Sequence, residues 1–87
     1  MYNNLMTTAS RRTVLIRAEE LRALGPEQTK IGETDLDELA RIALLVFLSA
    51  KTSLEEMSES ELDIIFDELL SEEDRAVVER VAIAIPD

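Results

Sequence analysis

Apolar residues recur every three or four positions along most of this chain, which is the spacing of helices with one buried side. The clearest stretch lies between Thr34, whose hydroxyl suits a helix N-cap, and Lys51, whose charge suits a helix C-terminus. The pattern predicts one long helix here. Its expected inward residues are Leu36, Leu39, Ala40, Ala43, Val46, Phe47 and Ala50.

The same stretch carries a second apolar face, made of Leu44, Leu45 and Leu48. A helix that is apolar nearly all round is normally buried on most of its sides. We therefore expect this helix either to be the centre of the fold or to contact another chain through its second face.

A helix is also predicted before this stretch, from Ser10 or Thr8 to Leu24, where the pair Gly25 and Pro26 stops it. Its expected inward residues are Val14, Ala18, Leu21 and Leu24. Residues 13–16 and 81–85 would also suit short strands, because both stretches are rich in β-branched residues.

Two more helices are predicted to begin at serines followed by acidic residues, a pattern typical of capping boxes. Either Ser53 or Ser58 would begin one of them, and a single short turn could precede this helix. Ser71 would begin the other. The inward residues are Leu62, Ile65, Phe66 and Leu69 in the first and Val77, Val78, Val81, Ala82 and Ile85 in the second. The sequence predicts an all-α fold, a small bundle of about four helices.

The composition indicates one small domain. The chain has 87 residues, 46% hydrophobic but only 3% aromatic, so its core is expected to be aliphatic. We assign residues 9–87 to a single helical domain and the polar, non-periodic residues 1–8 to a flexible N-terminal tail. The absence of cysteine favours the cytoplasm. No apolar run approaches the roughly 20 residues that span a bilayer, so we expect no membrane segment.

The sequence contains none of the common signatures of catalysis. It has no histidine or cysteine and only two glycines, which excludes a serine–histidine pair, a thiolate nucleophile and a glycine-rich phosphate loop. The acidic residues are explained as helix caps and solvated faces. We therefore expect no catalytic residues, no metal ligands and no cofactor.

The charge is strongly acidic, with a net value of −10. Residues 52–74 hold ten acidic residues and no basic one, which argues against direct binding of nucleic acid. This block is either a solvated face or a surface that docks on a basic partner. The candidate docking residues are Glu59, Glu61, Asp63, Asp67, Glu68, Glu72, Glu73 and Asp74.

Two isoleucines, Ile64 and Ile83, also fall on polar helix faces. Together with Leu44, Leu45 and Leu48 they form a candidate self-association face, from which we expect a homodimer. The sequence thus favours a non-catalytic protein–protein interaction module, a regulator or antagonist that binds another protein. Two alternatives remain open: an inhibitor that mimics DNA, and a structural subunit of a larger assembly.

Overall fold

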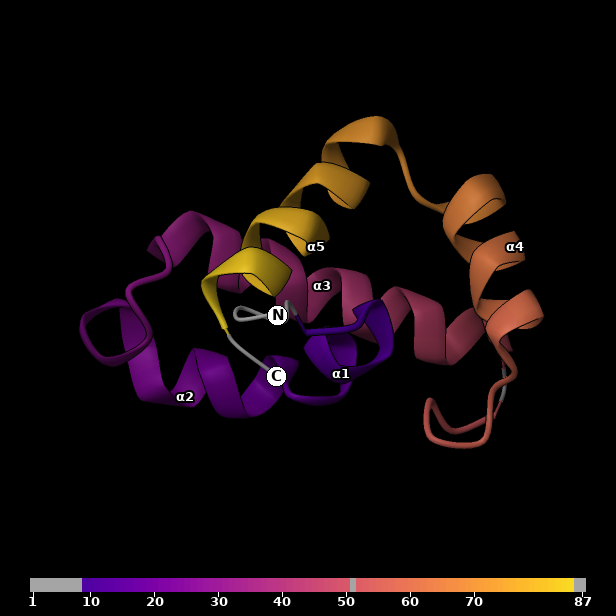
Figure 1. The fold of residues 1–87 in the computed structure, drawn as a ribbon, viewed down its shortest axis with the longest axis horizontal. Coiled ribbons are helices and arrows are strands. Elements are labelled where there is room, and N and C mark those ends of the chain that lie inside the picture. The colour runs from indigo at the N-terminus through magenta and orange to yellow at the C-terminus, as the bar shows by residue number, and fades with distance from the viewer. Residues whose placement is uncertain (1–8, 51, 86–87) are drawn as a thin grey trace, which may run out of the picture.

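The computed structural model describes residues 9–50 and 52–85, so the predicted tail over residues 1–8 lies outside the described residues. The described residues form five α-helices and no strand, which confirms the all-α prediction (Figure 1). The helices are α1 (Arg11–Ile16), α2 (Ala18–Thr29), α3 (Glu33–Ala50), α4 (Glu59–Leu69) and α5 (Glu72–Ala84).

The fifth helix arises because the first predicted helix is broken at Arg17, whose φ of −87° and ψ of 4° leave helical geometry. The N-cap at Ser10 is confirmed, since its hydroxyl accepts the Thr13 N–H at 3.1 Å. The break follows a stretch of β-branched residues, which are weak helix formers. The break changes the direction of the chain. Of the residues of α2, only Ala18 and Leu21 lie in the core. Leu24, expected in the core, is exposed.

The predicted stop at Gly25 and Pro26 is confirmed. Gly25 has a φ of 86° and a ψ of 171°, a conformation that an L side chain would strain, and it interrupts the helical geometry within α2. One further turn follows Pro26, and the Lys30 N–H closes it on the Pro26 carbonyl at 2.8 Å.

The long helix α3 begins before the predicted cap, so Thr34 lies inside the helix and the Gly32 carbonyl accepts the Leu36 N–H at 3.0 Å. Its buried face is rotated from the predicted one. Ile42 is fully buried, whereas Phe47, expected in the core, is 50% exposed. The residues of α3 that are fully enclosed are Leu36, Leu39, Ile42 and Val46.

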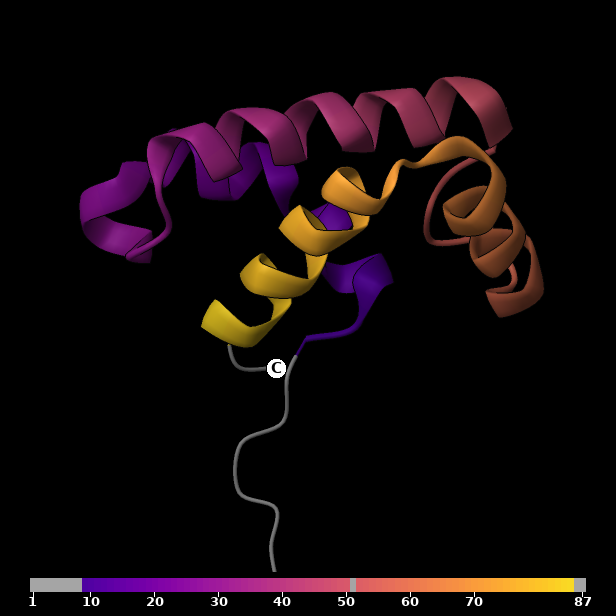
Figure 2. The ribbon, with the colours of Figure 1, turned by 90° about the horizontal axis from the view of Figure 1, so that it is seen from above.

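The other four helices all contact α3. Figure 2 shows them on one side of it, with the opposite side of α3 open. The core lies between α3 and the layer formed by α1, α2 and α5. The sequence leaves open whether this helix is central or contacts another chain; α3 is the central helix of the fold, yet one of its faces has no neighbour among the described residues.

The starts of α4 and α5 match the predicted caps. Ser58 and Glu61 form a full capping box, with both backbone-to-side-chain bonds at 3.1 Å, and the Ser71 hydroxyl accepts the Asp74 N–H at 3.1 Å. Ser53 begins only a single turn, closed by the Glu56 N–H. All five predicted inward residues after Ser71 are buried. The two stretches that would also suit strands are helical, over residues 13–16 and 81–84. In α4, Leu62 and Phe66 are buried, Ile65 is half-buried and Leu69 is exposed.

The first turn of α3 is tied to α5 by Asp35 and Arg80. The guanidinium donates from Nε at 3.1 Å and from Nη2 at 2.9 Å to the two carboxylate oxygens. These hydrogen bonds lower the pKa of Asp35, against the opposing effect of its partial burial.

This pair should make stability depend on pH in acid. A carboxyl whose pKa is lower in the folded state stabilises the fold above its unfolded pKa of about 3.9, and this contribution disappears as the pH falls through the folded pKa. Asp35→Asn should therefore lose less stability than the wild type between pH 5 and pH 2, measured by urea unfolding. Arg80→Gln should behave in the same way. A wild-type pH profile in both variants would contradict this role for the pair.

Candidate functional site: two interaction surfaces

The open side of α3 presents three large apolar side chains. Leu44 is 59% exposed, Phe47 is 50% exposed and Leu48 is 60% exposed. Leu45 is half-buried, because it points about 100° away from Leu44 around the helix axis. The predicted trio therefore splits, and Phe47 replaces Leu45 on this surface. We call Leu44, Phe47 and Leu48 the α3 face.

A groove runs along this face where α3 meets α1 and α2. One part of it, a hollow of about 390 Å³, is lined largely by apolar side chains that include Ile16, Phe47 and Leu54. A second, more open hollow continues it between the charged residues of α2 and α3. Ala40 and Leu44 line both hollows, so the groove is continuous past the small side chain of Ala40.

The two isoleucines of the predicted self-association face lie elsewhere. Ile83, 70% exposed, lines a separate hollow between the start of α1 and α5. Ile64, 55% exposed, belongs to α4, which lies on the other side of α3 from its open face (Figure 2). Of the five predicted residues, the structure brings only Leu44 and Leu48 together on one exposed surface.

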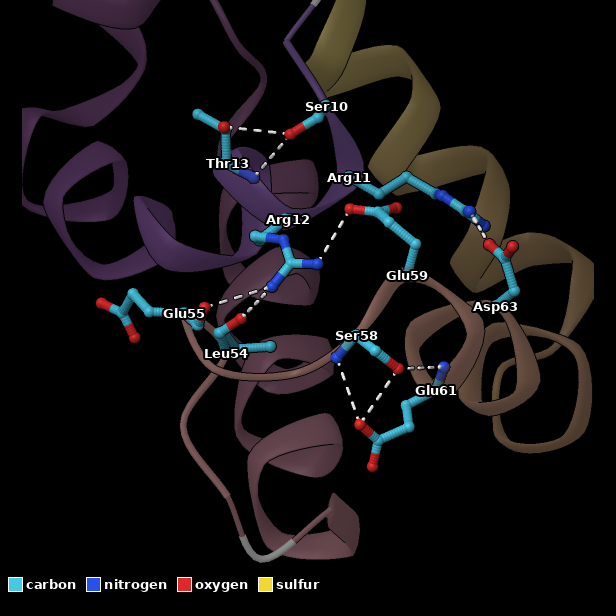
Figure 3. A network of polar contacts seen from close by, with 10 residues as sticks. All are labelled: Ser10, Arg11, Arg12, Thr13, Leu54, Glu55, Ser58, Glu59, Glu61 and Asp63. Carbon is cyan, nitrogen blue, oxygen red and sulfur yellow. Dashed lines mark hydrogen bonds and ion pairs between the residues drawn. The ribbon is translucent and has the colours of Figure 1, made fainter.

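The acidic block contains no basic residue, but in the folded chain its side chains contact arginines from other segments. Four of the eight candidate docking residues pair with arginines. Two of these arginines belong to α1 (Figure 3). The pairs are Arg11–Asp63, Arg12–Glu59 at 2.8 Å, Arg75–Asp67 at 3.6 Å and Arg41–Asp74 at 2.6 Å. Four of the ten acidic residues of the block thus have an arginine partner within the chain.

The remaining four residues are all exposed, and one of them, Glu61, serves the capping box. Glu68, Glu72 and Glu73 form no ion pair with any residue that the structure describes. They flank the turn between α4 and α5. Ile64 lies one helical turn before Glu68, on the same side of α4. We call Ile64, Glu68, Glu72 and Glu73 the acidic corner.

Two arginines that the sequence analysis does not single out hold α4 and its connector in place (Figure 3). Arg12 donates to the carbonyl oxygens of Leu54 at 2.7 Å and Glu55 at 3.4 Å, and to Glu59 Oε2 at 2.8 Å. The Arg11 guanidinium lies 4.6 Å from the centre of the Phe66 ring. The net basic N-terminal third of the sequence is the signal that could have suggested this pairing.

The two surfaces offer the chemistry of binding. Within residues 9–50 and 52–85, no group of three or more acidic side chains is placed to hold a metal ion, and no helix is long and apolar enough to cross a membrane. An exposed apolar face and an acid-rimmed isoleucine are features through which proteins contact one another.

Comparisons of the chain with protein-family models, curated proteins and solved structures find no match. Its function is therefore inferred from the geometry of its own residues.

Proposed function

We propose that this chain is a non-catalytic protein–protein interaction module, a cytoplasmic regulator or antagonist that docks its acidic corner on a basic surface of another protein. One observation carries the proposal. Ile64 is 55% exposed one helical turn before Glu68, and the three carboxylates that flank the turn between α4 and α5, Glu68, Glu72 and Glu73, have no cationic partner among the described residues. An apolar anchor with a polar rim is the common anatomy of a protein interface.

The electrostatics of the corner support a docking role. The chain already has a net charge of −10, so each unpaired carboxylate adds repulsion to the folded state. Arginines offset that repulsion at four other residues of the acidic block, whereas Glu68, Glu72 and Glu73 are exposed without such an arginine. A basic partner would supply the missing charge and would be attracted to this corner before contact.

The same pairing favours a protein partner over the DNA-mimic alternative. A DNA mimic needs a row of carboxylates spaced along its surface like backbone phosphates. Here arginines neutralise Glu59, Asp63, Asp67 and Asp74, which interrupts such a row and leaves a local patch. The structural-subunit alternative gives the acidic corner no role, so the experiment below separates it from docking.

Neutralising the corner should weaken partner binding at least tenfold while changing thermal stability little. In the triple variant Glu68→Gln, Glu72→Gln, Glu73→Gln, the lost attraction to the start of α5 is offset by reduced repulsion. Affinity capture from lysate with the wild type identifies the partner, and calorimetric titration then gives the dissociation constants. Ile64→Ser should weaken binding too, at unchanged net charge.

The matched control is the triple variant Glu27→Gln, Glu33→Gln, Glu79→Gln. It changes the net charge equally at exposed positions outside the acidic corner. Equal affinities of the two triple variants would show that only net charge matters and would defeat the proposal. Capture of no protein by the wild type would count against it as well.

A further inference from the structure

The groove beside the α3 face is less acidic in its lining than the net charge of the chain suggests. Arg22 and Asp37 pair at 3.1 Å beside its groove, and Glu19 and Arg41 line the same hollow. Over both hollows the groove is lined by three acidic residues and two arginines, in a chain whose net charge is −10. Copies of so acidic a chain repel one another. A second copy meets less of this repulsion at a nearly balanced, apolar face.

The shape of the face fits an antiparallel copy of α3. Ala40 lies four residues before Leu44 and leaves room in the groove, whereas Leu48 lies four residues after it and is 60% exposed. If two copies of α3 run antiparallel and cross at Leu44, each Leu48 lies over the Ala40 of the other copy. Bulky side chains then enter hollows, which restores close packing.

A parallel arrangement fits less well. It would set Leu48 against Leu48 and leave both hollows at Ala40 unfilled. It would also bring the two Asp37 side chains together, along with the two N-terminal halves of α3, which are acidic. In the antiparallel arrangement, the two Asp37 residues lie fourteen helical positions apart, about 21 Å along the axis.

We infer that the α3 face is the interface of a homodimer in which two α3 helices pack antiparallel, with Leu44 at the two-fold axis and Leu48 of each copy in the hollow beside Ala40 of the other. Such an interface is closed and uses the same patch on both copies. It does not involve the acidic corner, so the dimer and the proposed docking function can fail independently.

Disulfide trapping tests this geometry directly, because the chain has no cysteine of its own. Under mild oxidation the Leu44→Cys variant should form a covalent dimer, since its two Cα atoms meet at the axis. The Leu48→Cys variant should not, because its two Cα atoms lie about 12 Å apart along the helices, beyond the roughly 7 Å that a disulfide spans. The double variant Ala40→Cys, Leu48→Cys should be trapped again.

The control is Ile83→Cys, the most exposed large apolar position on another helix. Dimers of Leu48→Cys that form as fast as those of Leu44→Cys would overturn the antiparallel arrangement. Trapping of Leu44→Cys no faster than of Ile83→Cys would overturn the interface itself.

Sedimentation equilibrium checks the dimer without a cross-link. The wild type should associate in the micromolar range or tighter, and Leu44→Glu should weaken association at least tenfold by placing a charge in a desolvated contact. Its thermal melt should remain cooperative, because Leu44 packs little within its own chain. A wild type that stays a single species of 9.8 kDa at high concentration would defeat the inference.

Discussion

Phe66→Ala should lose about 3–5 kcal/mol of its free energy of unfolding, the usual cost of removing a large buried aromatic side chain. Phe66 is only 2% exposed and packs in the core beneath the Arg11 guanidinium. A domain of this size has about 5–15 kcal/mol in total. The variant should therefore be partly or fully unfolded at 37 °C, as urea and thermal denaturation followed by circular dichroism would show.

Phe47→Ala is the matched control, since it removes the same side chain from an exposed position of the same fold. At protein concentrations low enough to keep the chain monomeric, its cost should stay below about 1 kcal/mol. Equal losses in the two variants would mean that Phe47 also belongs to the core, and the buried face of α3 would then be wrongly placed.

Arg12→Met should cost about 1.5–3 kcal/mol, the range for hydrogen bonds made by a charged group. Arg12 holds the connector between α3 and α4 against α1, through the carbonyls of Leu54 and Glu55 and the carboxylate of Glu59. Methionine keeps the apolar stem but leaves these acceptors without their donor. Arg12→Lys should recover only part of the loss, because one ammonium group cannot reproduce the planar set of donors.

Arg17→Met serves as the control for Arg12, because Glu20, three residues later on the surface, is its only ion-pair partner within residues 9–50 and 52–85. Such exposed pairs contribute little, and the expected change is below about 0.5 kcal/mol. The two arginines are compared by urea unfolding at neutral pH. Similar losses at both positions, or no loss in Arg12→Met, would contradict the role assigned to Arg12.

The buried face of a helix can be predicted from the sequence when its apolar and polar residues lie on different sides of the helix. In α5 the large apolar residues other than Ile83 lie on one face, and all five inward residues are predicted correctly from the sequence. In α3 apolar residues occur nearly all round, so spacing alone cannot show which side faces inward. Phe47, which is predicted to point inward, is consequently exposed, and Ile42, which the predicted inward set does not include, is buried.

Features that depend on contacts between distant segments could not be predicted. The break at Arg17 reorients α2, so that Leu24 does not reach the core as Ala18 and Leu21 do, and no local pattern shows this difference. The same holds for the ion pairs of Arg11 and Arg12 with Asp63 and Glu59, which join positions about fifty residues apart in the sequence. The sequence shows the excess of acid but not which carboxylates remain unpaired.

The candidate surfaces were accordingly predicted in part. Leu44 and Leu48 follow from the second apolar face of the long helix, and their exposure agrees with that interpretation. Phe47 could not be assigned to this face until the rotation of the helix was known. Ile64 and Ile83 are exposed as expected, but the tertiary arrangement places them away from the open side of α3.

The most direct test of the docking proposal is the association rate with the captured partner, measured as a function of salt. If the acidic corner steers a basic surface, the rate for the wild type should fall at least tenfold between 50 mM and 500 mM sodium chloride. The triple variant at Glu68, Glu72 and Glu73 should associate slowly at both concentrations, with little salt dependence. The same salt dependence in the variant and the wild type would contradict docking through this corner.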